Sequence, residues 1–152
     1  MEITTDQIKK LRETTGGVSV MQCKRALQEA DGDSAKAVAI LKERSAAVVL
    51  ARTEHTLAAG TVGSYTHEGT IGAMALLSCE TDFVATNPAF AALARELAMQ
   101  IAAMDPENTE KLLAQPFIKD ESRIVQDLLN EATQKFGERV EISRFARLSA
   151  RS

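Results

Sequence analysis

One pair of residues in the chain could support nucleophilic chemistry, Cys79 with His67. A thiol of this kind needs a base held by a third, orienting group and a lowered pKa before it can attack a substrate. The sequence offers neither feature clearly, and it shows no phosphate-cradling loop, no paired carboxylates on a helix and no set of metal ligands. We therefore predict that the protein is not an enzyme and needs no metal or cofactor, with a cysteine-dependent enzyme kept as an alternative.

The residues that follow Cys79 indicate binding rather than catalysis. An apolar run over 71–77 precedes them, and Phe83 stands among polar or small neighbours. Asn87-Pro88 then opens a long amphipathic segment, since Asn caps helices well and Pro suits the first helical turn. The pattern predicts a buried strand, a short surface connection and a helix. Read alone, Phe83 is either a lid over the core or an anchor for a partner.

The N-terminal part of the chain is predicted to consist of short helices. Three helix-start signals occur there, two capping boxes and an aspartate cap: Thr4 with Gln7, Ser19 with Gln22, and Asp33. Short helices bury little apolar surface singly, so they must pack as a bundle. We predict a ubiquitin-associated-like three-helix domain over residues 1–44 and a connecting helix with a linker over 45–60.

The remaining residues, 61–152, predict a mixed domain. The expected elements are a β-hairpin over 61–67 and 71–79, helices over 88–104 and 107–114, a loop over 115–120 anchored by Phe117, a helix capped by Ser122, and a last strand over 139–148. The predicted fold class is therefore α+β, with a small three-stranded antiparallel sheet packed with helices behind the N-terminal bundle.

Composition excludes several classes of protein. The formal net charge of −3 argues against a nucleic-acid binder, which would carry a basic face. No apolar run approaches the ~20 residues that span a bilayer, and the N-terminus lacks the basic and apolar regions of a signal peptide. Two cysteines, Cys23 and Cys79, are too few for a disulfide framework. We expect them to be reduced, packed thiols of a cytosolic protein.

Four blocks of sequence resemble one family. They are Leu-Arg-Glu-Thr-Thr-Gly with Met-Gln-Cys-Lys-Arg-Ala-Leu, then Gly-Ser-Tyr-Thr-His, then Cys-Glu-Thr-Asp-Phe-Val, and finally Gln-Pro-Phe-Ile-Lys-Asp with Val-Glu-Ile-Ser-Arg-Phe-Ala-Arg. In this order they resemble elongation factor Ts. The resemblance implies a guanine-nucleotide exchange factor for the GTPase elongation factor Tu, which promotes GDP release during translation elongation by disturbing the Mg²⁺ and nucleotide site.

The resemblance also implies which residues meet the partner. The candidates are Thr81, Asp82, Phe83 and Val84 in the loop, and Leu11, Val20 and Met21 in the N-terminal helices. The alternative for the last three is that they only fill the core of the bundle. Short family members work as homodimers, which a small sheet with open edges also favours. The expected location is the bacterial cytoplasm, or an organellar matrix or stroma if the chain is processed.

The chain departs from the family pattern at several positions. The turn over 16–19 is one residue longer than usual, and Gln22 replaces an aspartate. Thr70 and Thr86 stand where the family often has basic residues, so charged contacts there are missing. A ubiquitin-like-binding or other non-catalytic interaction module remains the alternative function, because the N-terminal bundle alone would fit it.

Overall fold

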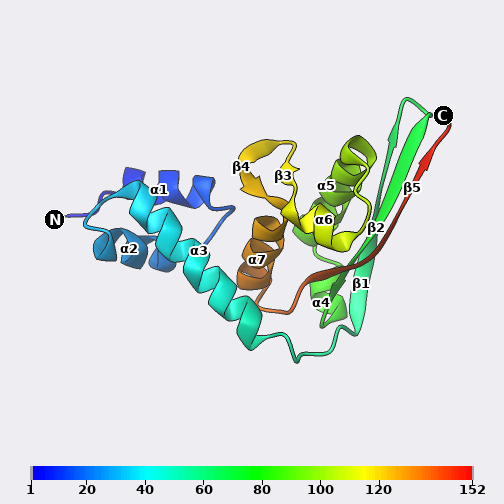
Figure 1. Ribbon diagram of the computed structural model, residues 1–152. Coiled ribbons are helices and arrows are strands. Elements are labelled where there is room, and N and C mark those ends of the chain that lie inside the picture. The colour runs from blue at the N-terminus through cyan, green and yellow to red at the C-terminus, as the bar shows by residue number, and fades with distance from the viewer. Residues whose placement is uncertain (1, 152) are drawn as a thin grey trace. The chain divides into compact units, whose positions relative to one another are not determined.

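The computed structural model describes residues 2–151. The first third of the chain is helical, and the strands all follow it (Figure 1). The chain forms two compact units: Met1–Thr53 with Asn130–Gly137, and Glu54–Leu129 with Glu138–Ser152. Together the elements make an α+β protein with a three-stranded antiparallel sheet, which confirms the predicted fold class.

Three capped helices build the N-terminal bundle. They are α1 (Thr5–Thr14), α2 (Val20–Glu29) and α3 (Ser34–Ala51), with Thr4, Ser19 and Asp33 as their N-caps. The Thr4 and Gln7 pair forms a complete capping box. Their inward residues form one apolar core: Leu11, Val18, Cys23, Ala26, Leu27, Ala30, Ala37 and Leu41. The predicted helix starts are therefore confirmed.

Helix α3 is longer than the sequence analysis expected. It continues without a break from Ser34 to Ala51, where we predicted a bundle helix ending at residue 44 and then a separate connecting helix. The segment after residue 44 is rich in alanine and holds no glycine or proline, so nothing in it stops the helix. Ser45 is buried on this continuation, and its hydroxyl donates to the side chain of Gln134.

The cap of α3 gives a direct stability test. One carboxylate oxygen of Asp33 accepts from the backbone N–H groups of Ala35 at 2.9 Å and Lys36 at 3.1 Å. We expect Asp33→Ala to lower the free energy of unfolding by about 1 kcal/mol, because two helix-end donors lose their acceptor. Urea unfolding followed by circular dichroism measures this. Glu43→Ala, an exposed change inside the same helix, should have no comparable effect.

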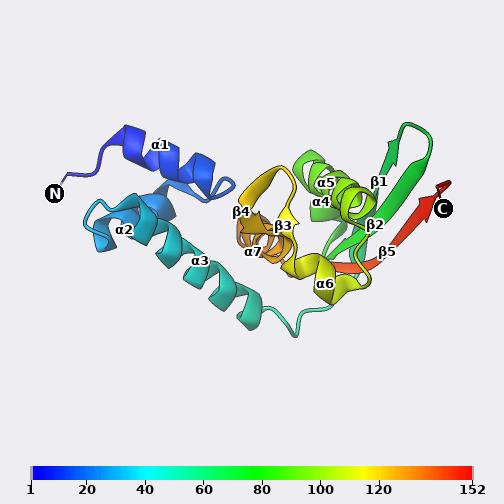
Figure 2. The ribbon, with the colours of Figure 1, turned by 45° about the horizontal axis from the view of Figure 1, so that its top comes forward.

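The second unit is organised around one sheet. Strands β1 (Ala59–His67), β2 (Ile71–Cys79) and β5 (Glu141–Ser149) are antiparallel in the order β1-β2-β5. Helix α5 (Pro88–Met104) packs along one face, and the helices of this unit lie on that side in both views (Figures 1 and 2). Alternate residues of β2, from Ala73 to Cys79, are buried against it. The predicted hairpin and last strand are confirmed.

A second, small hairpin replaces a predicted loop and helix start. After α6 (Thr109–Ala114), β3 (Pro116–Phe117) pairs with β4 (Asp120–Ile124), and α7 begins only at Val125 and ends at Phe136. The predicted cap at Ser122 is wrong, because its N–H and hydroxyl both bond to Asp120 within β4.

The side chain of Gln100, fully buried on α5, holds this region in place. Its amide nitrogen donates to the Pro116 carbonyl at 3.1 Å, and its amide oxygen accepts from the Ile118 N–H at 2.9 Å. A buried amide with both ends bonded fixes backbone that would otherwise be a loose connection.

Candidate functional site

The residues between β2 and α5 form a four-residue helix that displays Phe83. This helix, α4, covers Asp82–Ala85, and the Phe83 residue is 85% exposed. Its neighbour Val84 is 4% exposed, and Ala85 is also buried. Successive residues on a helix point about 100° apart, so burying one side of such a short turn turns the ring outward. Phe83 is therefore not a lid over the core.

Hydrogen bonds close both ends of α4. Thr81 is the N-cap, and its hydroxyl accepts from the Val84 N–H at 3.4 Å. At the other end the Thr86 hydroxyl donates to the carbonyl of Asp82 at 2.9 Å. The Thr86 side chain therefore closes the turn. Asn87 then caps α5 by accepting from the Ala89 N–H, as the sequence predicts.

A carboxylate from far along the chain bonds to the start of this loop. One oxygen of Glu138 accepts from the backbone N–H groups of Glu80 and Thr81, each at 3.0 Å, and its other oxygen accepts from the Thr81 hydroxyl at 2.6 Å. The Glu80 side chain in turn accepts from the Arg139 N–H at 2.5 Å. No pattern in the sequence around Glu138 indicates this contact, because nothing local in the chain links it to residue 81.

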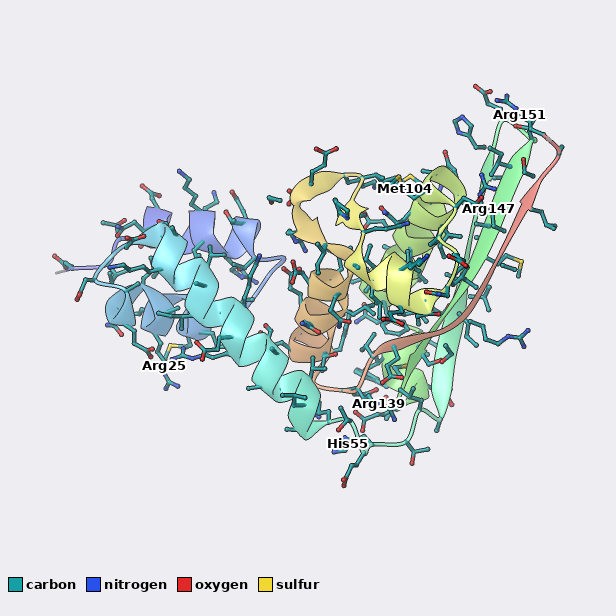
Figure 3. All side chains as sticks on the ribbon, in the orientation of Figure 1. Arg25, His55, Met104, Arg139, Arg147 and Arg151 are labelled. Atoms are coloured by element: carbon teal, nitrogen blue, oxygen red, sulfur yellow. The ribbon has the colours of Figure 1, made fainter. Side chains whose placement is uncertain are left out.

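His55, in the segment before β1, also contacts the residues at the start of this loop. His55 and Arg139 lie beside each other at the base of this unit (Figure 3), where the Arg139 guanidinium donates to the His55 carbonyl at 2.6 Å. Nδ1 of His55 lies 2.8 Å from Oε1 of Glu80. His55 lies at the surface, with 44% of its side chain exposed, while its ring and its backbone both contact this loop.

The structure rules out the cysteine and histidine pair. In the hairpin register His67 pairs with Ile71 and Cys79 pairs with Ala59, so the two residues stand at opposite ends of β1 and β2. Cys79 is fully buried, and burial together with the Glu138 carboxylate raises the pKa of its thiol. A buried thiol with a raised pKa is a poor nucleophile.

The N-terminal candidates separate into surface and core. Val20 and Met21, in the first turn of α2, are both exposed, because Cys23, Ala26 and Leu27 form the inward face of that helix. Leu11 is 2% exposed and packs in the bundle core. The structure therefore corrects the expectation for Leu11, whose side chain is not at the surface to meet a partner. Val84 is likewise an anchor of α4 rather than a surface residue.

Neither a metal site nor a membrane segment occurs in the part of the chain that the structure describes. Within residues 2–151 no three His, Cys, Asp or Glu side chains gather in a way that could bind a metal ion. None of the described helices combines the length and the apolar character that crossing a bilayer requires.

Comparison with known proteins identifies the family. The family model described as Elongation factor TS matches residues 80–152, the range that begins at this loop and includes Glu138. Elongation factor Ts of Oleidesulfovibrio alaskensis is 37% identical, with 95% of this chain and 96% of the relative covered, and that of Desulforamulus reducens is 35% identical, with 96% and 88% covered. Elongation factor Ts of Clostridium botulinum is 39% identical over 97% of this chain and 48% of the relative.

These matches and the fold together define the protein as a translation elongation factor. The chain belongs to the elongation factor Ts family. Its alignment with the Oleidesulfovibrio protein extends over 191 residues, more than the 152 of this chain, so the relative has residues within the aligned span that this chain lacks.

Proposed function

We propose that the protein is a guanine-nucleotide exchange factor for elongation factor Tu, acting by binding and not as an enzyme. The observation that carries the proposal is Phe83, a large apolar side chain 85% exposed on a turn whose two ends are capped. An exposed aromatic on a fixed backbone loses little conformational entropy when a partner buries it. It is therefore suited to insert into another protein.

The exchange follows from differential affinity. A protein that binds the nucleotide-free GTPase more tightly than the GDP-bound form must weaken GDP binding by the same factor. Mg²⁺ demands near-octahedral ligands at short distances, so a ring inserted beside its ligands in the partner would displace them. The diphosphate would then lose its counter-ion and leave faster.

The neighbours of Phe83 take different roles in this proposal. Asp82 and Thr81 are exposed beside the ring, and Asp82 can accept hydrogen bonds from the partner. The buried side chain of Val84 anchors the turn to the core. In the other unit, Val20 and Met21 give an exposed apolar pair on α2 that could contact the same partner. The function places the protein in the compartment where translation takes place.

The decisive experiment uses elongation factor Tu loaded with a fluorescent GDP. Mixing it in a stopped-flow instrument with excess unlabelled GDP and increasing amounts of this protein should raise the rate of fluorescence loss in proportion to the protein added. Bovine serum albumin at the same concentrations controls for non-specific effects. A release rate independent of the protein would overturn the proposed function.

We further propose that two copies of the chain associate through the open face of the sheet. Opposite α5, this face carries the exposed side chains of Val62, Met74 and Leu148, the last 79% exposed. The register places Met74 between Ser64 and Ala146, and Leu148 beside Gly72, so the apolar side chains share one surface. Exposed apolar clusters of this kind mark interaction sites, and a face that pairs with itself gives a two-fold dimer.

A charge on this face should separate the copies. Light scattering on a sizing column is expected to give about twice the 16.4 kDa of one chain for the unmodified protein, and one chain for Leu148→Glu. Leu50→Glu places the same charge on an exposed leucine of α3 and should leave the mass unchanged. A monomer in the unmodified protein, or a dimer that persists in Leu148→Glu, would contradict the association through this face.

A further inference from the structure

We propose that Glu138 is a positioning residue for nucleotide exchange, which it supports by holding the start of the Phe83 turn. The proposal rests on the proposed function and adds to it a residue that lies 55 positions from Phe83 in the sequence. Its carboxylate bonds to Glu80 and Thr81 at the start of the turn. It acts on Thr81, the residue that caps α4.

The hydroxyl bond of Thr81 to Glu138 has only one possible direction. A carboxylate can only accept, so the hydroxyl proton of Thr81 must point at Glu138 Oε2, 2.6 Å away. This leaves a lone pair of the same hydroxyl oxygen to accept from the Val84 N–H. Glu138 thus orders the cap, and the cap orders the first turn of α4, on which Phe83 stands.

The contact between the segments around residues 80 and 138 is reciprocal. Glu138 accepts from the N–H groups of Glu80 and Thr81, while the Glu80 carboxylate accepts from the N–H of Arg139. Each of the two chain segments therefore supplies a carboxylate to the backbone of the other. Hydrogen bonds to ionised groups are stronger than neutral ones, so the end of β2 cannot move away from the start of β5 without losing several of them.

The hydrogen bonds from Glu138 stabilise the four-residue helix α4. A helix this short has no stability of its own, since a first turn is costly to form. The buried Val84 and Ala85 hold one side of it, and Glu138 holds its N-terminal end. Removing the carboxylate should leave the sheet and α5 folded but let the turn vary in position. A shift of about 1 Å at a reacting site can cost about 100-fold in rate.

The test combines kinetics with an independent readout of the loop. We expect Glu138→Ala to lower kcat for release of fluorescent GDP from elongation factor Tu by about tenfold or more, with a smaller change in KM. Glu138→Gln keeps an oxygen acceptor for both N–H groups and should recover most of the rate. Glu121→Ala, an exposed glutamate in β4, is the matched control and should be unchanged.

Two further measurements separate positioning from general stability. Glu138→Ala added to Phe83→Ala should cause no additional loss of rate, because it acts through that ring; an additive loss would overturn the proposal. Amide hydrogen exchange of the free protein should become faster at residues 80 and 81 in Glu138→Ala, with the sheet amides unchanged. Unchanged amide protection at residues 80 and 81 would also overturn it. So would a rate of GDP release with Glu138→Ala equal to that with the parent protein.

The two proposals fail in different ways. If the unmodified protein does not accelerate GDP release, the proposed function is wrong. If the unmodified protein accelerates release and Glu138→Ala does so equally well, the proposed function stands and the role of Glu138 is wrong. The hydrogen-exchange measurement needs no partner, so it tests the loop contact in either case.

Discussion

Phe83→Ala is expected to reduce the exchange rate of elongation factor Tu by roughly 30-fold or more and to leave the fold unchanged. An aromatic anchor at the centre of an interface supplies about 2 kcal/mol or more, and each 1.4 kcal/mol corresponds to about tenfold. In the free protein the Phe83 residue is 85% exposed, so its removal opens no cavity and should change the free energy of unfolding by less than about 0.5 kcal/mol. Stopped-flow release of fluorescent GDP and thermal unfolding by circular dichroism measure the two quantities.

Two further variants make this prediction specific to the ring. Phe83→Leu keeps an apolar side chain but not its flat shape and should fall between the parent and Phe83→Ala. Leu50→Ala removes a comparably exposed apolar residue from α3 and should leave the exchange rate unchanged. Exchange by Phe83→Ala at the parent rate would remove the ring from the mechanism. A loss of helical signal in that variant would instead show that the ring supports the fold.

Gly63→Ala is expected to destabilise the protein by about 3 kcal/mol or more. A Cβ atom built at Gly63 would lie 2.2 Å from the carbonyl carbon of Ala94 and 2.5 Å from the backbone nitrogen of Arg95. These are backbone atoms of α5 and cannot rotate aside, so the whole helix would have to move off the sheet. Because α5 begins directly after the Phe83 turn, exchange activity should fall together with stability.

The matched control for Gly63→Ala is a glycine in the adjacent strand. A Cβ at Gly72 would meet nothing closer than 3.8 Å, so Gly72→Ala should change the free energy of unfolding by less than about 1 kcal/mol. Thermal unfolding of both variants under the same conditions provides the comparison. Equal stability of the two variants would contradict the close approach of α5 to β1.

Local chemistry made much of the fold predictable. The caps at Thr4, Ser19, Asp33 and Asn87 act within three residues of themselves, so their effect is written in adjacent sequence. The tight turn between β1 and β2 is likewise local: Gly69 has a positive φ of 69°, which glycine adopts readily, and Glu68 beside it has a φ of 51°. These features were predicted where they occur.

The errors arose where distant residues compete with local signals. Ser122 precedes an apolar segment and resembles a helix cap, but pairing of β3 with β4 draws it into a strand. Strand β3, which pairs with β4, is held by the side chain of Gln100 on α5. The sequence around residue 122 contains no sign of that contact. The resemblance made Leu11 a candidate for partner contact, although its place in the bundle buries it.

The sequence by itself determined the family, the helix starts, the hairpin and the position of an aromatic residue in a short connection. Whether that ring faced the core or the solvent was decided by the tertiary structure, through burial of its neighbour Val84. The partner of the last strand was decided there as well: β5 lies beside β2, with Glu141 opposite Ser78. That choice brings Glu138 to the start of the loop, because pairing of β5 with β2 sets the residues just before β5 beside those just after β2, 57 positions away in the case of Thr81.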